Sequence, residues 1–293
     1  MTTSPASSTI SASATDGMAQ PSKPAKSGSL RKRVISGVVL APLVLLVIYA
    51  GPLPTAALVL LAAMAMAGEL TDTAGGADRP VAVPIAVAAI SLVVIFAVTT
   101  TWPAVFVVAA AGGALAGLIL RGRAGLVTAS AFAYVAIACA AAIWLRQHPD
   151  IGGALLIWLL VLVWATDVGA FVAGRALGGW RLAPHLSPNK TWAGLLGGMG
   201  GAAVLSAASV AAFPVLGEVP WLTSLPAAAA MGAGLAVVEQ GGDLLESAWK
   251  RYFHVKDSGV VIPGHGGILD RTDGLLAVIL AVAALHLLLG TQA

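Results

Sequence analysis

Charged residues are scarce in this sequence: Asp, Glu, Lys and Arg together make up only 10% of it, whereas 58% is hydrophobic. A soluble domain carries about 25% charged residues. The chain therefore lacks the polar surface that a water-soluble globule needs, and its composition is typical of membrane proteins.

Cysteine is almost absent as well. The single residue, Cys139, excludes an intramolecular disulfide and a metal cluster built from cysteines. The net charge of +3 is a small basic excess. Because basic residues mostly set topology in a membrane protein, we predict no nucleic-acid partner.

Residues 1–33 are predicted to form a disordered cytoplasmic tail, because Ser, Ala, Thr and Pro dominate them without an apolar period. The tail ends in a basic cluster, Arg31, Lys32 and Arg33. The apolar run that follows lies too far along the chain for an ordinary secretory signal, and no small-residue cleavage site follows it. We interpret it as an uncleaved first membrane helix.

The rest of the chain reads as an all-α polytopic membrane protein with about nine spans, since a span needs roughly 20 mostly apolar residues. We divide it into N-terminal transmembrane helices (34–150) and a C-terminal catalytic region (151–293). The second and ninth spans are short. The predicted spans are 34–50, 54–70, 81–98, 103–120, 125–145, 152–174, 192–213, 225–249 and 274–290.

The basic residues test this arrangement. With the N-terminus inside the cell, every Lys and Arg except Arg146 falls in a cytoplasmic segment. This agrees with the excess of positive charge that cytoplasmic loops carry. The predicted cytoplasmic segments are 1–33, 71–80, 121–124, 175–191 and 250–273.

Two of these segments differ from ordinary loops. The first, 174–191, combines glycines with Arg175, Arg181 and Lys190 and with the hydroxyls of Ser187 and Thr191. Cations and freed backbone amides suit phosphate oxygens. A basic loop that merely anchors topology would have a similar composition, so this segment alone does not decide.

The second segment, 247–273, packs cations, histidines and aspartates around Gly264, Gly266 and Gly267. Glycines let a backbone approach a ligand closely. Aspartates are hard oxygen ligands that suit Mg²⁺ together with substrate phosphates. His254 and His265 lack the spacing and the sulfur ligands of a zinc site.

Acidic residues also lie inside predicted spans, where they are costly and usually functional. Asp167 is near the end of span 152–174. Glu239, Asp243 and Glu246 share one face of span 225–249, and Ser247 and Lys250 continue that stripe. Carboxylates so close repel one another unless a cation lies among them. Alternatively, they pair with Arg175, Arg251 or Arg271 and only hold helices together.

The segment 247–273 resembles the signature of the phosphatidate cytidylyltransferases (CDP-diacylglycerol synthases). It contains Ser-x-x-Lys-Arg at 247–251, Lys-Asp at 256–257 and Pro-Gly-His-Gly-Gly-x-x-Asp-Arg-x-Asp at 263–273. Asp-x-Gly-Ala-Phe-x-x-Gly-Arg at 167–175, Leu-Ser-Pro-x-Lys-Thr at 186–191 and Gly-Asp-Leu-x-Glu-Ser at 242–247 are similar too. The resemblance covers residues 160–275, and the preceding helices match only in being hydrophobic.

One position departs from the family pattern. The family usually has Glu shortly after Lys-Thr, in the form Thr-x-Glu-Gly, whereas this chain has Ala193 there. The role of that Glu is either absent here or supplied by another carboxylate.

The resemblance implies transfer of CMP from CTP to phosphatidic acid at the cytoplasmic face of a bacterial inner membrane. It also implies that the protein contacts membrane lipids and forms a homodimer. It implies Mg²⁺ held by Asp243 and Asp270, with Asp273 and Asp167 as supporting carboxylates. A second, monovalent cation such as K⁺ belongs to the same expectation. The predicted catalytic residues are Asp243, Asp270, Asp273, Lys256 and His265.

The expected substrate contacts are mostly cations and hydroxyls. Lys190, Arg251, Lys256 and Arg271 are candidates for the triphosphate and the lipid phosphate, and Ser187 and Ser247 for hydrogen bonds to phosphate or metal-bound water. His265 is either a general base or an orienting residue; a phosphate monoester is already a competent nucleophile, which favours the second role. The other predicted substrate-binding residues are Arg175, Thr191, Lys250 and Asp167.

Two other functions fit parts of the pattern. A related CTP-using enzyme would act on another lipid phosphate or phosphorylate a lipid alcohol. A secondary transporter would also carry intramembrane acids. However, the acids gather near one face rather than at the midplane, and the two halves show no matching repeats.

Overall fold

The structure is a computed structural model of the whole chain, and it describes residues 27–75, 79–259, 261 and 266–289. These residues are almost entirely helical, which confirms the predicted all-α class. The first helix begins at Ser27, within the segment predicted as a tail, and residues 1–26 lie outside the described residues. The helices are α1 (Ser27–Ala50), α2 (Pro52–Gly75), α3 (Arg79–Val98), α4 (Trp102–Leu120), α5 (Gly122–Arg146), α6 (Gly152–Leu177), α7 (Trp192–Ala212), α8 (Leu225–Tyr252) and α9 (Leu269–Leu289).

Within the described residues, seven helices are long and apolar enough to cross a membrane: α2 to α7 and α9. α8 is long but carries Glu239, Asp243 and Glu246, and the apolar stretch of α1 is Gly37–Ala50. The chain is therefore a polytopic α-helical protein, and the count of nine spans stays a prediction. α2 and α9 are longer than the short spans predicted for them, because both extend into polar sequence.

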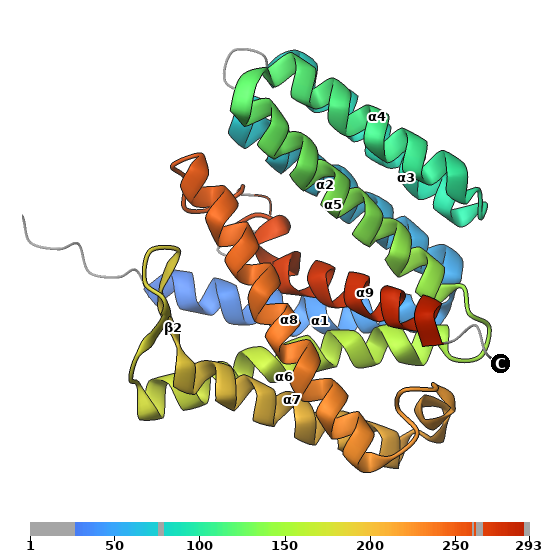
Figure 1. Cartoon of the computed structure of the whole chain (residues 1–293), viewed down its shortest axis with the longest axis vertical. Helices are drawn as coiled ribbons and strands as arrows, with labels where there is room; N and C mark the ends of the chain where they lie inside the picture. Colours follow the sequence, from blue (N-terminus) through green and yellow to red (C-terminus); the bar gives the residue numbers. More distant parts are fainter. Residues whose placement is uncertain (1–26, 76–78, 260, 262–265, 290–293) are drawn as a thin grey trace, which may run out of the picture.

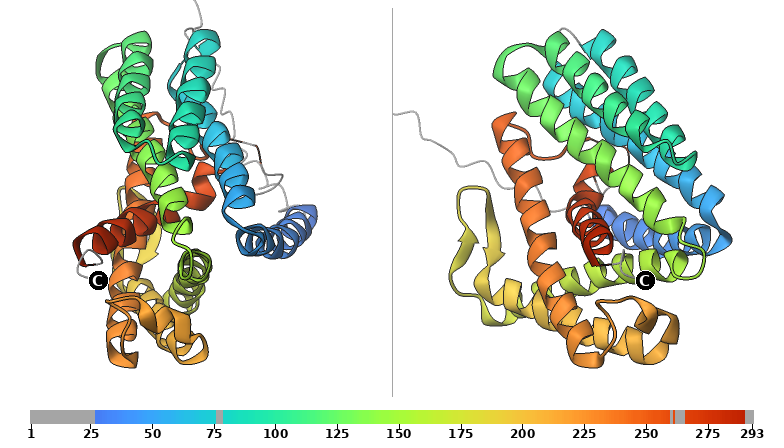
Figure 2. Two further views of the ribbon diagram at one scale, coloured as in Figure 1. Left: turned by 90° about the vertical axis from the view of Figure 1, so that its right-hand side faces the viewer. Right: turned by 45° about the vertical axis from the view of Figure 1, so that its right-hand side comes forward.

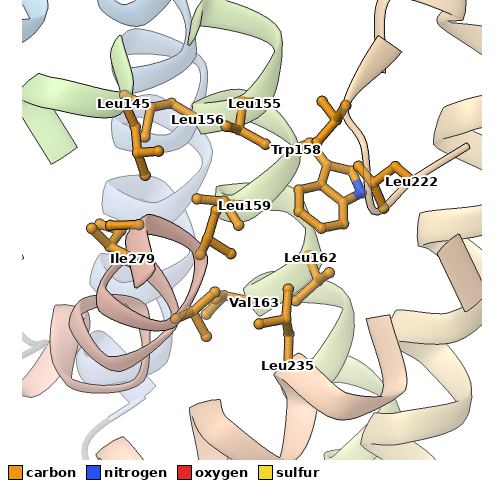
Figure 3. Close-up of a cluster of buried hydrophobic side chains, with 14 of the residues drawn as sticks. Leu145, Leu155, Leu156, Trp158, Leu159, Leu162, Val163, Leu222, Leu235 and Ile279 are labelled. Carbon is orange, nitrogen blue, oxygen red and sulfur yellow. The ribbon is translucent and has the colours of Figure 1, made fainter. Parts of the chain in front are cut away.

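The helices pack around two hydrophobic clusters. One lies mainly among α2, α3, α4 and α5. The other joins α6 to α1, α8 and α9, and it includes Leu159, Leu162 and Leu235 (Figure 3). Figures 1 and 2 show α2–α5 as one bundle of neighbouring helices, with α6 and α7 on the other side of α9, while α8 runs past α9.

α6 and α7 approach each other through glycines. A Cβ added to Gly169 would lie 2.4 Å from the carbonyl oxygen of Gly197. No side chain fits at that distance, so these residues allow the close backbone contact that small residues provide between membrane helices. This contact brings the end of α6 and the start of α7 together, next to the hairpin that joins them.

The segment between α6 and α7 was predicted as a cytoplasmic loop, and in the structure it forms a β-hairpin. Strand β1 (Arg181–Ala183) pairs antiparallel with β2 (Ser187–Thr191). We call the end of the molecule that carries this hairpin the hairpin end. At this end Arg251 Nε, near the end of α8, donates to the carbonyl oxygen of Leu186 at 3.4 Å.

Contacts at the end opposite the hairpin end join the last turns of four helices. At the end opposite the hairpin end, Arg146 Nη2 donates to the carbonyl oxygen of Ile48 at 3.0 Å, and Gln147 Nε2 donates to that of Val98 at 2.9 Å. His286 lies 3.1 Å from His148 there, measured between their Nε2 atoms. The last turns of α1, α3, α5 and α9 therefore meet at one end.

Candidate active site

The centre of the candidate site is a group of three carboxylates. Asp243 and Glu246 are one turn apart on α8. Asp273 was predicted to lie in a cytoplasmic loop, but it lies in the first turns of α9. One oxygen from each lies within 4.8 Å of the others. We call these three residues the acid cluster.

A close contact between α8 and α9 brings the acid cluster together. Gly242 directly precedes Asp243, and a Cβ at Gly242 would lie 2.8 Å from the carbonyl oxygen of Asp273 and 2.7 Å from Cβ of Ala277. The absence of a side chain at Gly242 therefore lets α9 lie against α8 at the height of the carboxylates.

The acid cluster fits a divalent cation. Three carboxylates that offer oxygen atoms within 4.8 Å of one another form a hard-oxygen ligand set. Mg²⁺ binds such sets through one or two carboxylates and completes its shell with water and substrate phosphates. The residues present are therefore compatible with the metal implied by the resemblance.

Two lysines neutralise part of this negative charge. Lys190 of β2 forms an ion pair with Asp243. Lys250 forms an ion pair with Glu246, and its Nζ lies 2.9 Å from Oδ1 of Asp270. Both lysine side chains are largely buried, so these ion pairs are shielded from solvent more than surface pairs are.

Asp270 lies outside the acid cluster, although the sequence analysis expected it to bind the metal. Its carboxylate accepts hydrogen bonds from the backbone N–H groups of Ser258 (3.0 Å) and Gly267 (2.8 Å) as well as from Lys250. In this arrangement Asp270 fixes the backbone between α8 and α9. A role as metal ligand stays a prediction.

Two cavities meet at Asp243. The first, of about 600 Å³, lies among the end of α6, the hairpin, the start of α7 and α8. We call it the polar cavity, because charged and polar side chains, among them Arg175, Lys190 and Thr191, line part of it. The second, of about 630 Å³, is mostly apolar and lies between α1, α2, α6 and α9. Asp167 and Asp243 line both cavities.

The apolar cavity has one polar end. Its walls include Val44 of α1, Leu159 of α6 and Ile279 of α9. Its polar end contains acidic residues and one arginine: Asp167, Glu239, Asp243, Asp270, Arg271 and Asp273. A molecule that combines an anionic head with an apolar body matches this distribution if its charge is balanced by a cation.

The structure brings together most, but not all, of the predicted site residues. Thr191 caps α7, since its Oγ1 accepts from the N–H of Gly194 at 3.0 Å, and it also lines the polar cavity. Among the predicted residues that the structure describes, five line neither cavity: Ser187, Ser247, Lys250, Arg251 and Lys256. His265 lies outside the described residues.

Sequence reasoning missed Glu69 and Gln240. Gln240 lines the polar cavity, and its Nε2 donates to Glu239 Oε2 at 2.8 Å. Glu69, near the end of α2, is 5% exposed and accepts hydrogen bonds from the N–H groups of Ile268 and Leu269 at the start of α9. An acidic residue within a long apolar helix was the signal for Glu69, because such residues are costly there.

A protein-family model matches most of this chain, and individual curated proteins match about half of it. The model of the cytidylyltransferase family matches residues 31–289. Proteins named phosphatidate cytidylyltransferase are similar: one from Brucella suis is 47% identical over 145 residues, and one from Bacillus subtilis is 40% identical over 156 residues.

A third relative of the same name, from Pseudomonas aeruginosa, is 41% identical over 142 residues. These alignments cover 49%, 53% and 48% of this chain and 49%, 55% and 50% of the relatives, so the chain spans about half the length of the curated relatives it matches. The family match covers far more than half of the chain, and the chain therefore belongs to the cytidylyltransferase family.

Proposed function

We propose that this protein is a phosphatidate cytidylyltransferase, which transfers CMP from CTP to phosphatidic acid and releases pyrophosphate. The observation that carries the proposal is the position of Asp243, which lines both a polar and an apolar cavity. A nucleotide and a lipid can then meet at one carboxylate. The names of the relatives support this choice of substrates.

In the proposed reaction, CTP binds in the polar cavity with its phosphates near Arg175 and Lys190. Cations so placed neutralise phosphate oxygens and hold them in position. Lys190 must exchange part of its ion pair with Asp243 for phosphate contacts. The chain thus supplies charge neutralisation and orientation, which dominate catalysis in phosphoryl transfer.

Phosphatidic acid binds with its acyl chains along the apolar cavity and its phosphate at the polar end, near Arg271. A phosphate oxygen of the lipid attacks the α-phosphorus of CTP. A new P–O bond forms, and the bond from the α-phosphorus to the bridging oxygen of the β-phosphate breaks. CDP-diacylglycerol and pyrophosphate are the products.

The acid cluster is the proposed Mg²⁺ site, with Asp243, Glu246 and Asp273 as ligands. Mg²⁺ held there would neutralise charge of the phosphate groups that come together. Asp270 remains the second ligand expected from the resemblance, and it has to release Lys250 to bind the ion. Carboxylates beyond those that one divalent ion needs, including Asp167 and Glu239, are candidates for a monovalent ion such as K⁺.

The proposed location is the inner membrane of a bacterial cell, with the hairpin end in the cytoplasm. The seven apolar helices and the bacterial sources of the relatives support a membrane location. The distribution of basic residues supports the orientation. A homodimer is part of the proposal by resemblance alone.

Pyrophosphate release by the purified protein in detergent tests the function. The assay contains CTP with or without phosphatidic acid and with Mg²⁺ or EDTA. Release that needs both the lipid and Mg²⁺ is the expected result. Formation of CDP without pyrophosphate would instead identify a CTP-dependent kinase, and absence of CTP consumption by folded protein with every lipid would contradict the proposal.

A further inference from the structure

Glu69 of α2 binds the segment that leads into α9. Its Oε1 accepts from the N–H of Ile268 at 2.8 Å, and its Oε2 accepts from the N–H of Leu269 at 2.9 Å. Ser258 donates its hydroxyl to Oε2 at 3.2 Å. One buried carboxylate thus contacts the segment between α8 and α9 both at Ser258 and at its last residue, Ile268.

These contacts cap α9 from another helix. The first N–H groups of an α-helix have no partner within the helix. α9 begins at Leu269, so Glu69 satisfies a terminal donor of α9 and the one just before it. A carboxylate at this place also interacts favourably with the helix dipole. The cap comes from a residue 200 positions earlier in the chain.

The surrounding backbone is shaped to receive this carboxylate. A Cβ at Gly267 would lie 2.6 Å from Oε2 of Glu69, and a Cβ at Gly259 would lie 2.8 Å from Oε1. Thr73, one turn beyond Glu69 on α2, donates its hydroxyl to the carbonyl oxygen of Ser258 at 3.3 Å. The contact is therefore a built junction between α2 and the start of α9.

The junction leads directly to the acid cluster. Asp273 follows Leu269 by about one turn of α9, and Asp273 must lie within 4.8 Å of Asp243 and Glu246 on α8. A small shift of the start of α9 would move one carboxylate away from the other two. Residues that orient metal ligands in this way have large effects on metal binding without touching the ion.

We infer that Glu69 is a positioning residue, which fixes the start of α9 so that Asp273 completes the cation site with Asp243 and Glu246. This inference rests on the proposed function for its effect on catalysis, but its effect on cation binding is separate. It gives the N-terminal half of the chain a direct part in building a site whose ligands all lie in the C-terminal half.

The test compares Glu69→Gln with the unchanged protein and with Glu218→Gln, which removes an exposed carboxylate from the 3₁₀ turn Pro214–Glu218. Gln keeps the size of Glu but replaces one acceptor oxygen with an NH₂ group, which cannot accept, so either Ile268 or Leu269 loses its hydrogen-bond partner. Mn²⁺ is the probe, and its binding is followed by electron paramagnetic resonance. Pyrophosphate release at varied Mg²⁺ concentration is measured in parallel.

We expect Glu69→Gln to weaken Mn²⁺ binding about 10-fold and to raise the Mg²⁺ concentration needed for half-maximal rate by a similar factor. The KM for CTP should stay within about 2-fold at saturating Mg²⁺, because the polar cavity is built by other helices. Glu69→Asp, which keeps the carboxylate, should recover part of the binding. Glu218→Gln should match the unchanged protein.

Unaltered Mn²⁺ binding by folded Glu69→Gln would overturn the inference, as would a complete lack of Mn²⁺ binding by the unchanged protein. If Glu69→Gln fails to fold, Ser258→Ala decides, because it removes one hydrogen bond to Glu69 and leaves both backbone contacts. It should weaken Mn²⁺ binding in the same direction by a smaller factor, and no change would count against the inference. If Mn²⁺ binding depends on Glu69 but no pyrophosphate is released, the proposed function fails and the positioning role stands.

Discussion

Lys190 on strand β2 and Asp243 on α8 form an ion pair that links the hairpin to the acid cluster. In the sequence, Lys190 belongs to a basic segment that could simply anchor the topology, and Asp243 belongs to the row of acidic residues that suggests a metal site. The ion pair connects the two. Because both residues line the polar cavity, the lysine is placed to exchange its carboxylate partner for a phosphate.

Replacing Lys190 with Met should therefore weaken CTP binding more than it harms the fold. We expect the KM for CTP to rise about 10-fold or more, because a cation that contacts phosphate is removed. Steady-state kinetics of pyrophosphate release at saturating phosphatidic acid measures this. Arg181→Met is the matched control, since Arg181 is an exposed cation of the same hairpin that lines neither cavity. Equal effects of both changes would mean that the hairpin contributes only general positive charge.

Changing Asp243 to Asn should nearly abolish turnover, with a loss of about 100-fold or more, because it removes a proposed metal ligand and keeps the shape of the side chain. Expression and membrane insertion should stay intact. Glu239→Gln should do less harm, since Glu239 lies outside the acid cluster and is hydrogen-bonded to Gln240. Near-normal turnover by Asp243→Asn would contradict the metal assignment while leaving the family membership untouched.

The sequence predicted the class of fold and the surroundings of Asp243, because both depend on local signals. Long apolar runs predict helices, and acids at helical spacing predict one face, so Asp243 and Glu246 lie together as expected. The same reasoning failed at the start of α9. Asp270 and Asp273 were predicted in a loop, because a polar stretch before an apolar run does not show where a helix begins.

Contacts across long chain distances were beyond the sequence. Nothing near Glu69 indicates that its partners are Ile268 and Leu269, since that pairing depends on where the fold places the end of α2 relative to the start of α9. The different contacts of Asp270 and Asp273 could not be predicted from the sequence either. Their separation by three residues puts them on one side of a helix, yet one binds Lys250 and backbone amides while the other joins the acid cluster.

The apolar cavity makes the proposed lipid site testable. Val44→Trp would place a large side chain in that cavity from α1. We expect the KM for long-chain phosphatidic acid to rise about 5-fold or more while the KM for CTP changes little. The change weakens binding of the acyl chains equally in the ground state and the transition state, so kcat should be unaltered. Dioctanoyl phosphatidic acid, whose chains are shorter, should be affected less.

Leu46→Trp provides the control for this change. Leu46 lies on the same helix but is exposed, so a Trp there should face lipid and leave the kinetics unaltered. If Val44→Trp and Leu46→Trp both behave like the unchanged protein with long-chain lipid, the acyl chains do not bind along this part of α1.

Two adjacent glycines of α8 offer a paired test of how the acid cluster is assembled. Gly242→Ala would place a Cβ 2.7 Å from Ala277 and 2.8 Å from the carbonyl oxygen of Asp273, so α8 and α9 must move apart. Overpacking of this kind costs about 1–3 kcal/mol. A Cβ at Gly241 meets nothing within 4 Å, so Gly241→Ala should gain up to about 1 kcal/mol of stability from its higher helix propensity.

Thermal unfolding in detergent should thus show a lower Tm for Gly242→Ala and an equal or higher Tm for Gly241→Ala. Mn²⁺ binding should weaken only in Gly242→Ala, because the movement separates Asp273 from Asp243. Equal Tm values and equal Mn²⁺ affinities for the two variants would show that the α8–α9 contact does not set the geometry of the acid cluster.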